Sequence, residues 1–495
     1  MLTVAKIAAS GAGAYGEYLE GRTQAAEAGD YYLSEGGERV EAPGRWASLG
    51  SVGAAALGVD AGGPVAAEQF RAVMAVRNPS TGGRLRAGGA GGQAVAAIDA
   101  TFSAPKSVSA VWALGSPELR QEIEAAQERA VDAALAHATE YVPMVRRRVD
   151  RETVLRETPA ELLASSWRHT TARAVAGRAP DPQLHSHVVL HGAVRQGDGK
   201  VVAIESRAWL VHQRELGAAY RAQLAAELER LGFAVEAGTG RGGRYFELSG
   251  VPESLLEAWS GRHRQVHEQI ERRLAERLSE LQAQVAAGGP DADAAAQRLA
   301  ALENSGQLLP AEQRAVAMST RAAKSLSGGF QTAGDLDQAW WQDAREHGFD
   351  ARSVEVLRDS EQVVDVAESE PEPALARRIL ERLTEFDATF AAREARAVAL
   401  EAIAGAEDPD RALAVLERLR ERREILSLAD GRETTRRHRG TERAAVAAAR
   451  ALAGTPSEPI APELVDDDVR ELRSELALGG AARRRAGAGD AGGVL

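Results

Sequence analysis

The sequence contains no cysteine, and this absence excludes several kinds of site at once. Without a thiol the chain cannot form a disulfide bond, a zinc finger, an iron–sulfur cluster or a cysteine nucleophile. Long apolar runs are also missing, and residues 1–15 lack the apolar stretch of a signal peptide. We therefore expect a cytoplasmic protein that does not insert into a membrane.

The sequence also lacks the Gly-x-x-x-x-Gly-Lys-Ser/Thr loop that cradles the phosphates of ATP. The nearest pattern, at 197–200, has no upstream glycine and is followed by Val201. We therefore predict no ATPase activity and no helicase motor in this chain.

Basic residues are outnumbered by acidic ones, 60 against 72, and the net charge is −12. Proteins that bind nucleic acids usually carry a basic surface, so the total charge argues against this class. The distribution of charge matters more, because residues 101–250 contain 19 Lys and Arg against 18 Asp and Glu. The acidic excess lies elsewhere, and a DNA-binding face in this segment remains compatible with the composition.

The first half of the chain alternates strand and helix patterns. Strand patterns occur at the start of 98–112, at 188–194, at 200–206 and at 244–250, and helix patterns at 117–140 and 207–232. This mixture predicts an α+β or α/β domain of roughly 250 residues. From Pro252 onward the pattern is almost wholly helical, with helices expected at 253–285, within 310–350 and within 375–425.

Four of the ten histidines lie in the segment WRHTTARAVAGRAPDPQLHSHVVLHGAV. His185 and His187 are two residues apart and lead into a strand, so their side chains point to one face. A turn-forming stretch at 177–182 can bring His169 back beside them. His191 shares their parity, but four residues along a strand is about 13 Å, too far for the same ion. A metal site and ordinary strand polarity are both compatible with this spacing.

Four of the seven tyrosines fall within the first 32 residues, at Tyr15, Tyr18, Tyr31 and Tyr32. Tyr15 and Tyr18 share a face if their segment is helical. A phenol can act as a covalent nucleophile once its proton is removed, but such tyrosines are more often packing residues with a polar tip. The residues alone leave both interpretations open.

Four blocks, in this order, resemble the TrwC/TraI-type relaxases of the MobF class. They are MLTVAKI at the start, the two tyrosine groups ahead of APGRW, DATFSAPKSVS, and RHTTAR followed by DPQLHSHVV. The combination of FSAPKSVS with DPQLHSH is specific, and the resemblance covers about residues 1–352. It implies a palm-like antiparallel sheet flanked by helices, the fold of HUH endonucleases, followed by a largely helical C-terminal region.

The resemblance implies a conjugative relaxase that nicks one DNA strand at a specific site during plasmid transfer. In that family a tyrosine attacks the scissile phosphate and keeps the 5′ end covalently, while three histidines hold a divalent metal ion at that phosphate. The partners implied are single-stranded DNA at a transfer origin with an adjacent hairpin, a coupling protein, and a separate helicase.

By position, the resemblance assigns His169, His185 and His187 as the metal ligands. Asp99 would orient a ligand histidine or take the proton of the tyrosine, and Lys106 would approach phosphate or hold the local turn. Neutral imidazoles suit Mn, Zn or Ni better than Mg, but Mg is abundant in cells, so the identity of the metal stays open.

The family usually has adjacent tyrosines in its first group, whereas Gly16 and Glu17 separate Tyr15 from Tyr18 here. We prefer Tyr18 as the first nucleophile because of the LEG that follows it, with Tyr15 as the alternative. The second group, Tyr31 with Tyr32 beside it, would serve the later transfer step. The arginines expected to contact DNA are Arg146, Arg147, Arg148, Arg241 and Arg244.

We divide the chain into five parts on these grounds. They are a relaxase core (1–250), a helical extension that completes it (251–355), an acidic linker (356–374), a helical module resembling the lead-in to a helicase (375–455), and a flexible tail (456–495). The sequence leaves three alternatives to a conjugative relaxase. They are a hydrolase whose metal activates water, a rolling-circle replication initiator or transposase of the HUH type, and a decayed relaxase that only binds DNA.

Overall fold

The computed structural model describes most of the chain at the level of side chains. The described residues are 1–8, 44–86, 95–172, 178–239, 244–319, 333–359, 371–403 and 408–453, with the short strands β2 (Ser34–Glu35) and β3 (Glu38–Arg39). They form two compact units. Residues 44–259 and 333–440 belong to one unit together with the first strand, and residues 260–319 and 441–453 belong to the other.

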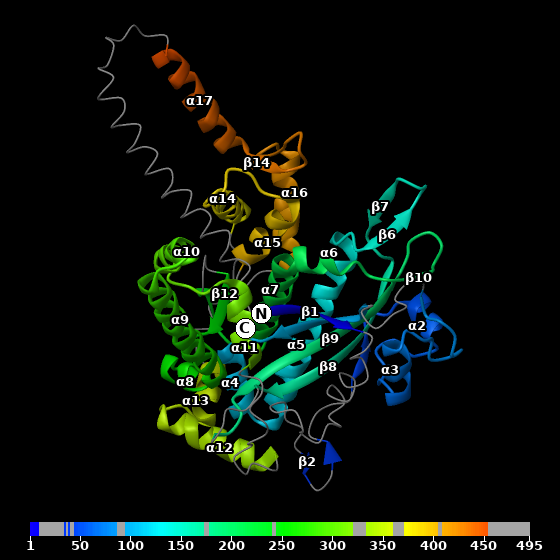
Figure 1. The fold of residues 1–495 in the computed structure, drawn as a ribbon. Helices are drawn as coiled ribbons and strands as arrows, with labels where there is room; N and C mark the ends of the chain where they lie inside the picture. The colour runs from blue at the N-terminus through cyan, green and yellow to red at the C-terminus, as the bar shows by residue number, and fades with distance from the viewer. Residues whose placement is uncertain are drawn as a thin grey trace. The chain divides into compact units, whose positions relative to one another are not determined.

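Six strands of the described chain form the central antiparallel sheet, in which β9 is the middle strand (Figure 1). In spatial order they are β1 (Leu2–Ala8), β5 (Val95–Ser103), β9 (Pro182–Val194), β8 (Glu161–Thr171) and β4 (Arg45–Ala47), with β10 (Val201–Val202) paired to the end of β9. Side chains alternate between the two faces of such a sheet. In β5, Ile98, Ala100 and Phe102 enter one apolar core, while Asp99 and Thr101 point to the opposite face.

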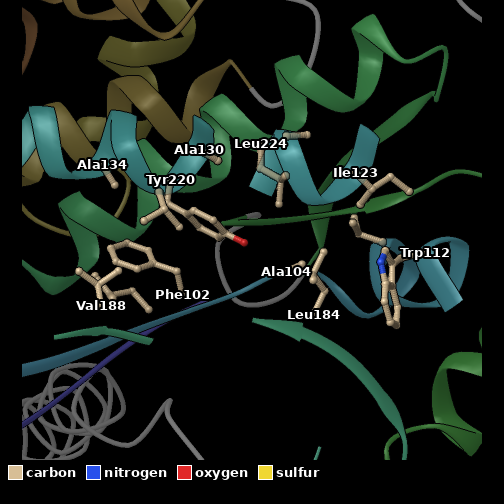
Figure 2. Packing of buried hydrophobic residues seen from close by; sticks show 14 of the residues in the cluster. Phe102, Ala104, Trp112, Ile123, Ala130, Ala134, Leu184, Val188, Tyr220 and Leu224 are labelled. Atoms are coloured by element: carbon tan, nitrogen blue, oxygen red, sulfur yellow. The ribbon is translucent and has the colours of Figure 1, made fainter. Parts of the chain in front are cut away.

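One face of the sheet is covered by α4 (Lys106–Leu114), α5 (Pro117–Tyr141) and α7 (Gln213–Arg230), as Figure 2 shows. Helix α5 starts where a Ser-Pro pair predicts it, because Ser116 Oγ accepts a hydrogen bond from the backbone N–H of Leu119 at 3.2 Å. The ring of Phe102 packs 5.3 Å from that of Tyr220, centroid to centroid. The buried Tyr220 hydroxyl donates to Gln127 Oε1 at 2.6 Å, so the polar end of this tyrosine has a hydrogen-bond partner inside the core.

The opposite face carries a smaller apolar core and the candidate site. Helices α2 (Ser51–Leu57) and α3 (Ala67–Met74) contribute to this core, in which Phe70 packs against Trp167 of β8 with ring centroids 4.8 Å apart. Trp167 is the cross-strand neighbour of His187, and paired residues share a face. The histidine side chains therefore lie on the face opposite to α5 and α7.

The first unit contains further strands and helices. They are β6 (Val145–Arg148), β7 (Val154–Glu157), α6 (Ser206–Val211), β11 (Val235–Thr239), β12 (Tyr245–Leu248), α8 (Glu253–Ala258), α12 (Ala333–Glu346), α13 (Ala351–Asp359), α14 (Glu372–Leu383), α15 (Ala392–Ala402), α16 (Pro409–Glu421), β13 (Ile425–Ser427) and β14 (Glu433–Thr435). Helices α14, α15 and α16 form a third apolar core together with one face of α7. These three helices are therefore packed against α7.

The second unit contains α9 (Gly261–Ala287), α10 (Ala292–Ser305) and α11 (Pro310–Ser319), and α17 (Arg436–Ala453) runs from the first unit into the second. Within the described part of the chain, no helix has the length and apolar character needed to cross a bilayer.

The predicted fold class is confirmed: an antiparallel sheet flanked by helices, followed by a largely helical region. Three expected elements are wrong in detail. The helix expected at 207–232 is divided at His212 into α6 and α7. The strand expected at 200–206 is only Val201–Val202, because Ser206 already begins α6. The single helix expected at 253–285 is broken between α8 and α9. The domain borders derived from the sequence stay a prediction.

Candidate metal centre

Three imidazole rings converge on one face of the central sheet. His169 of β8 is the cross-strand partner of His185 on β9, and His187 follows two residues later. The ring centroids lie 5.3 Å apart for His169 and His185, 5.0 Å for His169 and His187, and 5.2 Å for His185 and His187. One nitrogen from each ring lies within 4.8 Å of the other two, and all three side chains are buried.

Hydrogen bonds orient two of these rings. His187 Nδ1 donates to the carboxylate of Asp99, with distances of 3.0 and 3.1 Å to its two oxygens. His185 Nδ1 lies 2.9 Å from the backbone oxygen of Gln183. In metal sites a hydrogen bond of this kind holds the imidazole in place. It also leaves Nε2 to bind the metal and raises the basicity of that nitrogen. The donor set is therefore suited to a divalent ion that accepts imidazole ligands.

Thr101 belongs to the same cluster but is not singled out by sequence reasoning. Its Oγ1 lies 3.2 Å from His187 Nδ1 and 3.3–3.4 Å from the oxygens of Asp99. Thr101 is also the cross-strand partner of His187. Its parity with Asp99 within the block DATFS is the pattern that would have placed it on this face.

His191 points to the same face but lies outside the cluster. Its Nε2 is 3.0 Å from Ser165 Oγ, which also accepts from Trp167 Nε1 at 3.1 Å. The ring packs edge-on against Phe70. Burial, aided by the charge of Arg86, lowers the pKa of His191 to about 3, so the ring is neutral at pH 7.

The family model described as TrwC relaxase matches residues 12–347, which is more than half of the chain. The chain belongs to the TrwC relaxase family. The resemblance to MobF-class conjugative relaxases drawn from the sequence blocks is thereby confirmed.

Two curated relatives of this relaxase-family chain are the multifunctional conjugation proteins TraI of Escherichia coli and of its strain K12. The first is 30% identical over 258 residues, and the second is 30% identical over 260 residues. Each match covers 50% of this chain but only 13% of TraI. The chain therefore corresponds to a small part of those relatives.

Solved structures of the conjugative relaxase TrwC in complex with oriT DNA have the same fold. The metal-free complex aligns with a TM-score of 0.50 and the metal-bound complex with 0.51, both at 26% identity. Each alignment covers 71% of this chain and 100% of the TrwC chain.

Lys106 of this relaxase-family chain stands at the first residue of α4 and is partly buried. Its Nζ lies 3.4 Å from the backbone oxygen of Pro182, where β9 begins. Burial lowers the pKa of Lys106, and the negative charges of Asp181 and Glu247 oppose this shift. This placement supports the second of its two expected roles, which is to hold the local turn.

The arginines expected to contact DNA lie in different settings. Arg146, Arg147 and Arg148 form an exposed row on β6, which pairs only with β7 among the described strands. Arg147 Nε donates to Glu157 at 2.9 Å. Arg244 is half-buried, and its backbone oxygen accepts from Arg221 Nε at 3.0 Å.

Some expected site residues lie outside the described residues. They are Tyr15, Tyr18, Tyr31, Tyr32 and Arg241.

Proposed function

We propose that the chain is a conjugative relaxase that nicks one strand of DNA by tyrosine transesterification. The observation that carries this proposal is the convergence of His169, His185 and His187, with Asp99 bound to His187, in a chain of the TrwC relaxase family. The substrate proposed is single-stranded DNA at a transfer origin beside a hairpin. Complexes of the related TrwC with oriT DNA support this choice.

The three imidazoles would hold one divalent ion, whose charge would stabilise the developing negative charge on the scissile phosphate. The set of three neutral nitrogens fits such an ion, because three ligands leave positions open for DNA oxygens. Asp99 holds the ring of His187 through its Nδ1–H, and Thr101 adds a second contact to the same nitrogen. Asp99 is therefore proposed as a positioning residue, which orients the metal ligand His187.

The nucleophile proposed is the phenol of Tyr18, with Tyr15 as the alternative, and Tyr31 and Tyr32 serve the later transfer. Ala5 of β1 is the cross-strand partner of Asp99, and β1 ends at Ala8. Six residues lie between Ala8 and Tyr15, so Tyr15 is the seventh residue after the end of β1. A chain of that length spans up to about 24 Å when extended, which is enough to return to the centre.

The covalent bond between tyrosine and phosphate conserves the energy of the phosphodiester bond that is broken. The phenol loses its proton, its oxygen bonds to phosphorus, and the bond from phosphorus to the 3′ oxygen breaks. The 3′ oxygen takes up a proton and leaves, and the 5′ phosphate stays on the tyrosine. Rejoining reverses these steps and requires no ATP. A coupling protein and a separate helicase remain proposed partners, and the lack of a motor in this chain stays a prediction.

The test is the formation of a covalent adduct with single-stranded oligonucleotides tiled across the DNA beside the gene. We expect an SDS-stable adduct that requires a divalent metal and is lost in His169→Ala, with mass spectrometry identifying the modified tyrosine. Tyr18→Phe and Tyr15→Phe separate the two first-group candidates. Metal-dependent cleavage without any adduct would instead identify a hydrolase, and binding without cleavage a decayed relaxase.

A further inference from the structure

A cavity of about 420 Å³ lies where β5 begins, outside the histidine centre. Its walls come from β5, β9, β6, the segment that leads into α6, and Arg86. Figure 1 labels β6, β9 and α6. Its lining includes three guanidinium groups, those of Arg86, Arg146 and Arg207. Glu205 supplies the lining's carboxylate, and most of the remaining lining side chains are apolar.

Arg86 is a buried cation that has no acidic partner within the described residues. It is only 7% exposed. Its Nε donates to the backbone oxygen of His191 at 2.8 Å, and its Nη2 donates to those of Ala96 and Val95 at 2.6 and 3.4 Å. Carbonyl oxygens satisfy the donors but do not neutralise the charge, and a buried unpaired charge is costly. The charge is therefore available to an anion in the cavity.

Arg146 lies opposite a second arginine. In the β6–β7 ribbon its cross-strand partner is Arg156, and like charges directly opposite each other are destabilising. Glu205 accepts a hydrogen bond from Arg156, whose Nε donates to its carboxylate at 2.8 Å. That hydrogen bond lowers the pKa of Glu205, and the charges of Arg146 and Arg207 lower it further.

The balance of charge around the cavity is strongly positive. The guanidinium groups of Arg86, Arg146 and Arg207 line the cavity, and its one carboxylate, Glu205, is already engaged by Arg156. Guanidinium groups recognise phosphate through paired N–H donors. The volume lies within the range of roughly 300–1,000 Å³ of small-ligand pockets, which is more room than inorganic phosphate needs. The apolar part of the wall suits the sugar or base of a nucleotide unit.

We propose that this cavity is a second phosphate site, which binds a backbone phosphodiester of the DNA strand that the histidine centre cleaves. The proposal rests on the proposed function, because it takes the same DNA strand as its ligand. His191 lines the cavity and lies four residues along β9 from His187, so the two residues are about 13 Å apart along the strand. Ile98 and Leu190 also line the cavity and belong to the core on the other face, so the cavity lies at the end of the sheet where β5 begins.

The experiment compares the salt dependence of DNA binding between two double variants of the full chain. R146A/R207A removes two exposed arginines of the cavity, and Arg86 is left in place because it holds backbone oxygens of β5 and β9. R230A/R422A removes two exposed arginines elsewhere and is the matched control for charge. The probe is labelled oligothymidylate, because backbone contacts do not depend on sequence.

The slope of the logarithm of the DNA association constant against the logarithm of the salt concentration should become shallower by about 0.7 in R146A/R207A. This is the value for one phosphate of a single strand. The slope of R230A/R422A should equal that of the wild type. Equal slopes in all three proteins would overturn the proposal. Nicking by the wild type is measured in parallel, so that failure of the proposed function is distinguished from failure of the cavity alone.

A second arm distinguishes the DNA backbone from a free anion, which has the same chemistry. Inorganic phosphate and thymidine monophosphate are titrated while the melting temperature is followed. If either raises the melting temperature of the wild type but not that of R146A/R207A, and the DNA slopes are equal, the cavity binds a free anion and the DNA assignment is wrong. If the DNA slopes differ as predicted, the assignment to the backbone holds.

Discussion

The Nδ1–H of His187 on β9 is held by the carboxylate of Asp99, 3.0 Å away on the neighbouring strand β5. An ionised carboxylate can only accept, so this contact requires the proton on Nδ1 and presents Nε2 as the basic nitrogen. The first prediction follows from this pair.

Asp99→Asn should lower the affinity for a divalent metal by about 10- to 100-fold, because it removes the charge that orients and activates His187. Titration calorimetry with Mn²⁺ measures the change. Asp198→Asn, an exposed aspartate of the turn after β9, should leave the affinity unchanged. An Asp99→Asn protein with the affinity of the wild type would show that the carboxylate does not support the centre.

His169→Ala should abolish binding of one equivalent of metal, since it removes one of three converging ligands. His191→Gln is the matched control, because His191 is also a buried histidine of the same face but contacts Ser165 instead. We expect His191→Gln to retain one equivalent, measured by metal analysis after dialysis. If both variants lost the metal while circular dichroism showed that both were folded, the assignment of His169 as a ligand and His191 as a non-ligand would be wrong.

The stability of the folded chain should fall as the pH drops below about 6.5, in part because of His191. The pKa of His191 is about 3 in the folded state, whereas an unfolded histidine has a pKa of about 6.5. Between these values the unfolded state takes up a proton that the folded state does not, which lowers the free energy of unfolding by about 1.4 kcal/mol for each pH unit. This contribution is fully present above pH 6.5.

Urea unfolding at pH 7, 6 and 5 checks this dependence. His191→Gln should be less stable than the wild type at pH 7, and the difference should narrow as the pH falls. A constant difference across these three pH values would mean that His191 takes up its proton equally in the folded and unfolded states.

Glu215 should be among the most sensitive single positions for stability outside the site. Burial alone would raise the pKa of Glu215, but hydrogen bonds from His137, His212 and Arg396 lower it to about 2. Glu215→Ala leaves these three donors without their acceptor and should destabilise the chain by about 3–5 kcal/mol. Denaturant unfolding measures the change. Glu268→Ala, an exposed position of α9, should change the stability by less than about 0.5 kcal/mol.

Much of the site could be predicted because its residues follow strand periodicity. A two-residue spacing puts His185 and His187 on one face in any strand, and the structure shows that His169 reaches them as a cross-strand partner. Thr101 is harder to find, because a threonine in a strand is ordinary and only its pairing with His187 distinguishes it. The roles of these residues as metal ligands stay predictions.

Other features depend on pairings between distant segments that periodicity does not describe. The strand pair β13–β14 lies within a stretch expected to be helical, and each strand has only three residues. The cavity is lined by five separate segments of the chain, one of which contributes Arg86, so no local sequence pattern predicts it. Glu215 meets Arg396 only because α15 packs against α7.

The central position of β9 has a consequence for how the protein loses its function. Hydrogen bonds to β5 and β8 hold this strand along both edges, so His185 and His187 belong to the part of the sheet that is last to open. Amide protons of β9 should exchange with solvent only through global unfolding. Gentle warming should therefore detach the peripheral elements long before it disturbs the imidazoles, and inactivation should coincide with the cooperative melting of the whole sheet.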